Sequence, residues 1–182
     1  QATADHGRLD PALDAAIDRS IQTVRAFHAA GRPEDYSVTT APGVECAMRY
    51  LPLDPVGLYV PAGSAPLPST AVMLLVPALL AGCRQIVLAT PPNESGLADD
   101  AVLAVARKLG LDKVLVAGGA QAIAAMAYGT ESVPACAKLF GCTGADLEKA
   151  LTHESKEIAG EKIHTPLPAA AAELPAAELA VG

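Results

Sequence analysis

The chain has 182 residues, of which 51% are hydrophobic and only 3% aromatic, and its formal net charge is −7. This length suits one compact domain with extensions, and its core must consist mostly of Ala, Val and Leu. Nucleic-acid binding needs a basic face to neutralise phosphates and aromatic side chains to stack bases. The composition therefore excludes that class of function.

The most hydrophobic segment, Thr70 to Gly82, is too short to span a bilayer and contains Pro77, so we expect a buried helix and no membrane span. No secretory signal is visible in the sequence, and none is expected. The four cysteines form no CxxC pair, which indicates reduced thiols, with Cys83 buried, in a soluble reducing compartment: the cytoplasm or the matrix or stroma of an organelle. A chain that starts at Gln1 suggests a processed precursor or a fragment.

Residues 1–50 are expected to form an N-terminal helical arm. Asp10 and Pro11 are typical of an N-cap and a first helical position, and Gly31 is typical of a helix end. Between them one apolar face recurs at helical spacing: Leu13, Ile17, Ile21, Val24 and Phe27. Such a stripe must dock on the rest of the chain or on another subunit.

Residues 51–141 alternate apolar strands with helices. Strands are expected at 56–60, 86–89, 114–117 and 138–140, and helices at 69–82, 97–109 and 121–127. This order predicts an α/β fold with a parallel sheet, right-handed crossovers and helices on both faces. Residues 142–182 change character: a polar helix is expected at 144–160, followed by an extended Ala/Pro-rich tail.

Ligands of open parallel sheets bind at the carboxyl ends of the strands. Turns follow three of the expected strands there, and a Gly-Gly turn that opens a helix suits a nucleotide phosphate. The candidate binding residues are Tyr59, Pro61, Gly63, Gly118, Gly119 and Gln121. Plain packing explains such turns equally well, and the usual GxGxxG fingerprint is absent. The two histidines near HESKE are expected to be solvated surface residues.

Two stretches resemble histidinol dehydrogenase: Ala41 to Pro92, which contains VGLYVPAGSAP, and Val116 to Pro134, which contains GGAQAIAAMAYGTESVP. The resemblance runs from about Leu13 to Gly141. It implies an incomplete Rossmann-like, three-layer αβα module of a homodimeric enzyme that oxidises L-histidinol to L-histidine with NAD and zinc. Carried over to this chain, Tyr59 and Gln121 match NAD contacts of the family.

The departures from the family pattern are informative. Ala62-Gly63 replaces a Gly-Gly pair, Ala137 replaces an aspartate, and the asparagine expected soon after Gly141 is missing. No family sequence is recognised beyond Gly141, so the catalytic Glu-His pair and the zinc ligands have no counterpart, and weak NAD binding is expected at best.

Two hypotheses follow. The chain is either an inactive lobe reused as a structural or accessory subunit, with protein partners or a homo-oligomer, or a truncated but genuine enzyme of histidine biosynthesis. Whether it is an enzyme by itself is left open.

Overall fold

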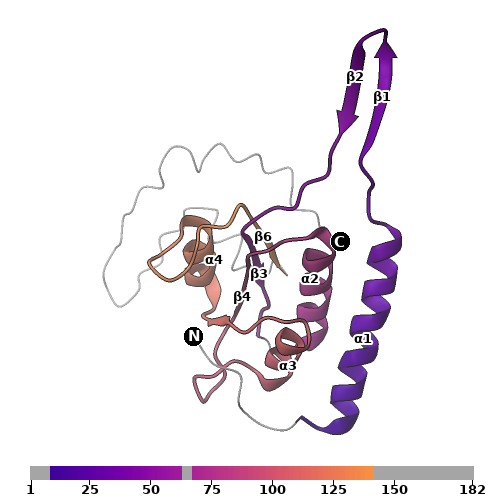
Figure 1. Ribbon diagram of the computed structural model, residues 1–182. Helices are drawn as coiled ribbons and strands as arrows, with labels where there is room; N and C mark the ends of the chain where they lie inside the picture. Colours follow the sequence, from indigo (N-terminus) through magenta and orange to yellow (C-terminus); the bar gives the residue numbers. More distant parts are fainter. Residues whose placement is uncertain (1–8, 63–66, 142–182) are drawn as a thin grey trace. The chain divides into compact units, whose positions relative to one another are not determined.

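The computed structural model describes residues 9–62 and 67–141 (Figure 1). Its centre is a sheet of four strands: β3 (Val56–Tyr59), β4 (Ile86–Thr90), β5 (Val114–Val116) and β6 (Lys138–Gly141). The strand order is β5-β4-β3-β6, and every pairing is parallel. The predicted α/β fold with a parallel sheet is confirmed, whereas the tail expected over 142–182 lies outside the described residues.

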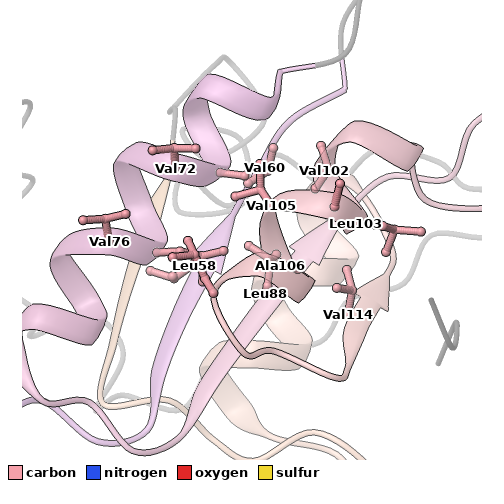
Figure 2. Packing of buried hydrophobic residues seen from close by; sticks show 14 of the residues in the cluster. Leu58, Val60, Val72, Val76, Leu88, Val102, Leu103, Val105, Ala106 and Val114 are labelled. Atoms are coloured by element: carbon pink, nitrogen blue, oxygen red, sulfur yellow. The ribbon is translucent and has the colours of Figure 1, made fainter. Parts of the chain in front are cut away.

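Helices pack on both faces of this sheet. One face is covered by α2 (Pro68–Ala81) and α3 (Asp100–Lys108), and the other by α4 (Gly119–Tyr128). The hydrophobic residues form two cores: the first lies between the sheet and helices α2 and α3, and the second lies between the sheet and α4. Because side chains alternate along a strand, Leu58 lies in the first core and its neighbour Tyr59 lies in the second. The first core is aliphatic, as the composition requires (Figure 2); it brings together Leu58, Val60, Val72, Val76, Leu88, Val102, Val105 and Val114.

Gly57 in β3 allows α4 to approach the sheet closely. A Cβ added at this position would overlap Leu139 Cδ2 and would lie 3.1 Å from Met126 Sδ and 3.3 Å from Cys136 Sγ. Position 57 therefore needs a residue without a side chain, because side chains of the second core already occupy the space beside its backbone.

The predicted N-terminal helix is present as α1 (Pro11–Ala30), and its capping is confirmed because Asp10 Oδ1 accepts a hydrogen bond from the Ala12 N–H at 2.7 Å. Ile17 and Ile21 are buried against the first core. The prediction was wrong at Phe27, whose side chain is 77% exposed. The apolar stripe docks through its middle, at Ile17 and Ile21, and not at Phe27.

The expectation of a purely helical arm over residues 1–50 missed a β-hairpin. Strands β1 (Tyr36–Ala41) and β2 (Val44–Met48) pair antiparallel around Gly43, which has a φ of +77°. Every residue of both strands is exposed. Each strand carries only a short apolar alternation, Tyr36 and Val38 in the first and Val44, Cys46 and Met48 in the second, and this weak signal was missed.

The third helix starts later than the sequence predicted. The side chain of Asn93 accepts hydrogen bonds from the N–H groups of Ser95 and Leu97 at 2.9 and 3.0 Å. These bonds hold the segment in a turn, so α3 begins at Asp100 with Asp99 as its N-cap.

Two smaller expectations concern the cysteines and the membrane. Cys46, Cys83 and Cys136 are free thiols, and Cys83 is half-buried where full burial was expected. Among the described residues, no helix combines the length and hydropathy that crossing a bilayer would require.

Candidate functional site: the carboxyl edge of the sheet

The turns singled out in the sequence do lie along one edge of the sheet. Where β3 ends, the Val60 N–H donates to the Ala89 carbonyl at 2.9 Å. Where β5 ends, the Ala117 N–H donates to the Thr90 carbonyl at 3.0 Å. These two bonds align the carboxyl ends of β3, β4 and β5, which is the edge where ligands of open α/β sheets bind.

Tyr59 connects two of these turns. The residue is 8% exposed and packs in the second core with Ala122 and Ile123 of α4. Its hydroxyl oxygen accepts a hydrogen bond from the Gly119 N–H at 3.0 Å. The last residue of β3 therefore fixes the first turn of α4, a helix that follows β5, sixty residues further along the chain.

Each glycine of the Gly-Gly pair at the start of α4 is required for a steric reason of its own. Gly118 is the N-cap, and a Cβ added there would lie 2.8 Å from Pro91 Cβ, at the end of β4. Gly119 has a φ of +63°, a conformation that side chains disfavour. Both glycines are needed for the turn itself, whether or not a ligand binds.

The helices at this edge differ in how their N-termini are capped. Asp99 Oδ1 accepts from the N–H groups of Ala101 and Val102 at 2.9 and 3.3 Å, so a carboxylate already occupies the start of α3. The N-caps of α2 and α4 are Leu67 and Gly118, and neither provides a side-chain cap. An anion is therefore accommodated best at the start of α4 or α2.

Of the remaining predicted residues, Gln121 lies at the start of α4. Gln121 is exposed on the first turn, with its Oε1 3.1 Å from the position that a Gly119 Cβ would take. Pro61 is half-buried just after β3, and Gly63 lies outside the described residues. The structure brings Tyr59, Gly118, Gly119 and Gln121 together, while their contact with NAD stays a prediction.

The described residues do not fit a zinc ion. In 9–62 and 67–141, His, Cys, Asp and Glu side chains nowhere gather in a group of three or more that could hold a metal. Two titratable groups with a shifted pKa, Asp54 and Cys83, precede β3 and β4 and so lie at the opposite, amino edge of the sheet. We derive no chemical step through a metal from this part of the chain.

Sequence reasoning missed what two residues do at this edge. Pro91 packs on Gly118, and Asp99 caps α3. An aspartate directly before a helix is a known signal for an N-cap, but the apolar periodicity extended the predicted helix past it. The contact of Pro91 is between residues far apart in sequence and left no local signal.

The fold defines the class: a Rossmann-like αβα module, in which a parallel sheet lies between helices and its carboxyl edge is open. The histidinol dehydrogenase family model matches residues 1–173. The chain belongs to the histidinol dehydrogenase family.

Comparison with individual relatives supports the same family assignment. The chain is 48% identical over 174 residues to histidinol dehydrogenase of Idiomarina loihiensis, a match that covers 96% of this chain and 39% of that protein. It is 60% identical over 138 residues to that of Xanthomonas euvesicatoria, covering 76% of this chain and 32% of the relative. The crystal structure of histidinol dehydrogenase from Elizabethkingia anophelis superposes with a TM-score of 0.74 at 39% identity, over 79% of this chain and 33% of the other.

These matches correct one expectation and set one limit. The family model extends to residue 173, so the prediction that the resemblance ends at Gly141 was wrong. The chain nevertheless spans only 39% and 32% of the lengths of the two relatives, and it corresponds to the N-terminal portion of the family.

Proposed function

We propose that this chain is the NAD-holding lobe of a histidinol dehydrogenase and contributes to the NAD-dependent oxidation of L-histidinol to L-histidine. The observation that carries the proposal is the hydrogen bond between Tyr59 and Gly119, which fixes the start of α4 at the carboxyl edge of the sheet, where the N-cap Gly118 supplies no side chain of its own. Membership of the family supports NAD as the ligand, because members of this family generally use NAD.

In this proposal each feature of the edge has a definite task. The first turn of α4 offers backbone N–H groups and the positive end of the helix dipole to the pyrophosphate. Tyr59 keeps that turn in place, and the exposed Gln121 provides an amide at its rim. Bound NAD would supply the hydride acceptor, and the residues of this chain would hold and orient it.

Isothermal titration of the full chain with NAD tests the proposal. We expect weak binding, with a dissociation constant of about 0.1–1 mM, because few side chains converge on the edge. Gln121→Ala should weaken binding further. Gln85→Ala is the matched control, since Gln85 is exposed just before β4, at the amino edge. Equal affinities for the two variants, or no binding to the wild-type chain, would contradict the proposal.

We expect the chain by itself not to oxidise histidinol. The reaction needs a base and polarisation of the alcohol oxygen, and among the described residues no cluster of ligands could hold the zinc that the resemblance implies. Purified chain with zinc, NAD and histidinol should therefore release no NADH. Sustained, zinc-dependent NADH production would show that the active site is complete.

A structural or accessory role in a larger assembly is the second candidate function. The exposed hairpin favours it, because Tyr36, Val38 and Met48 present apolar surface that nothing described covers. Purification of the native chain distinguishes the two: an accessory subunit should appear in a stable complex whose formation does not depend on NAD.

A further inference from the structure

A groove of about 310 Å³ lies on the α2 face of the sheet, away from the candidate NAD edge. It is bounded by α2, by the segment that precedes β3, and by β3 and β6. Its rim includes Leu51, Leu53 and Met73, which are 81%, 44% and 52% exposed, and Phe140 of β6 lines it from the sheet side. A concave apolar surface of this kind marks an interaction site.

The lining of the groove indicates what kind of occupant it takes. Every lining residue is apolar except for the thiol of Cys83, and no charged side chain contributes. A small-molecule site usually adds a few polar groups that fix the orientation of the ligand. An apolar segment of a protein needs no polar groups in the groove that receives its side chains, so this groove fits a protein partner.

The position of β6 argues in the same direction. This strand lies at one end of the sheet, paired with β3 on one side only within 9–62 and 67–141. Among those residues nothing pairs with the outer side of β6, and an edge strand of this kind can pair with a further segment of a larger fold. The relatives are long enough to supply such a segment, because the chain spans only 32% to 39% of their lengths.

We propose that this groove is the docking surface for the C-terminal portion of a histidinol dehydrogenase chain, the portion that this chain does not span. A second copy of the same chain is a poorer fit, because a symmetric contact would set one concave groove against another. The proposal deepens the proposed function, on which it rests, by naming the partner that completes the lobe.

The test measures whether the two protein chains associate, and not whether histidinol is oxidised. Its failure can therefore be distinguished from failure of the proposed function. The full chain, tagged, is co-expressed with the C-terminal portion of the Xanthomonas euvesicatoria relative, and the tagged chain is recovered. We expect the two to co-purify. Met73→Lys should abolish recovery, because it places a charge on the exposed rim of the groove. Phe27→Lys is the matched control, on the exposed end of α1.

Thiol labelling locates the contact. Cys83 lines the groove, whereas Cys46 is exposed on the hairpin, and mass spectrometry of peptides distinguishes them. In the complex we expect the labelling rate of Cys83 to fall about tenfold or more while that of Cys46 stays within about twofold. Leu51→Ser, in a segment outside the helices and strands, is a second groove variant if Met73→Lys disturbs folding as judged by circular dichroism.

Three results would overturn the proposal. One is failure of the wild-type chain to recover the C-terminal portion. Another is recovery that neither groove variant weakens. The third is protection of Cys83 in the chain alone that grows with its concentration, which would assign the groove to self-association.

Discussion

Tyr59 shows how one side chain can link distant parts of this sequence. Its ring fills the core under α4 and its hydroxyl oxygen accepts the Gly119 N–H, so the same residue supports the helix and positions its first turn. The sequence alone suggested a ligand contact for this tyrosine. In the structure the hydroxyl has an internal partner, which makes Tyr59 a positioning residue in the proposed NAD site.

Replacing Tyr59 by Phe should keep the packing and remove only the hydroxyl. The Gly119 N–H then loses its acceptor in a half-buried place, so we expect the free energy of unfolding to fall by about 1 kcal/mol. NAD affinity should fall as well, because the first turn of α4 is held less firmly. Urea denaturation and NAD titration measure the two effects, with Tyr128→Phe as the control at an exposed tyrosine. Unchanged stability would show that the hydrogen bond contributes nothing.

Asp54 is a second residue whose environment has a measurable consequence. The Gln85 backbone N–H donates to its carboxylate at 2.7 Å and Arg84 Nε donates at 2.9 Å. The pKa of Asp54 is lowered, first by the Gln85 N–H and then by Arg84, against an opposing effect of desolvation. Charged Asp54 therefore stabilises the connection between the start of β3 and the start of β4.

The stabilisation from Asp54 should disappear in acid. A carboxyl whose folded pKa lies below its unfolded value stabilises the fold above the unfolded value, and this contribution is lost as the pH falls through the folded pKa. We expect Asp54→Asn to lower the urea midpoint at about pH 7 and to differ little from wild type at about pH 3. Asp112→Asn is the control at an exposed carboxylate. A difference that is as large in acid would show that packing, and not charge, is responsible.

At the scale of elements, α1 is attached to the lobe by two kinds of contact. Lys108 of α3 reaches Asp14 at 3.0 Å and Asp18 at 2.8 Å, and Ile17 and Ile21 are buried against the first core. The carboxylates are about half exposed, so the ion pairs are screened by water. Burial of the two isoleucines removes apolar surface from water and should dominate.

We therefore expect Ile17→Ala to lower the free energy of unfolding by about 2–4 kcal/mol, since Ile17 is only 4% exposed. Lys108→Met should cost less than about 1 kcal/mol, and less again at high salt. Urea denaturation of both variants at low and high salt separates the two contributions. A larger loss for Lys108→Met would mean that the ion pairs, and not the apolar stripe, attach α1.

The elements that were predicted well are those with a local signal. The cap at Asp10 and the apolar runs of β3, β4 and α2 depend on neighbouring residues, and the structure confirms them. The hairpin was missed because each of its strands carries only two or three alternating apolar residues, which is a weak signal. At the site, the turns were found from their glycines and prolines, but the bond from Gly119 to Tyr59 joins residues sixty apart and could not be inferred from spacing.

At the scale of the whole molecule, the lobe and the hairpin have different sources of stability. The lobe has two cores, one on each face of its sheet. In the hairpin, Tyr36 pairs with Met48 and Val38 pairs with Cys46, so these side chains share one face, yet all of them are exposed. An isolated two-stranded hairpin is marginal in water, which suggests that this face is meant for a partner.

Replacing residues 36–49 by a short Gly-Ser linker should therefore leave the stability of the lobe almost unchanged. No residue of the two strands is buried, so we expect the free energy of unfolding to stay within about 0.5 kcal/mol of wild type. Urea denaturation followed by circular dichroism measures it, with Ile17→Ala as the destabilised reference. If the exposed face of the hairpin binds a protein partner, the deletion should abolish binding of that partner while the free energy of unfolding stays unchanged. A loss of about 2 kcal/mol or more would instead make the hairpin part of the folded lobe.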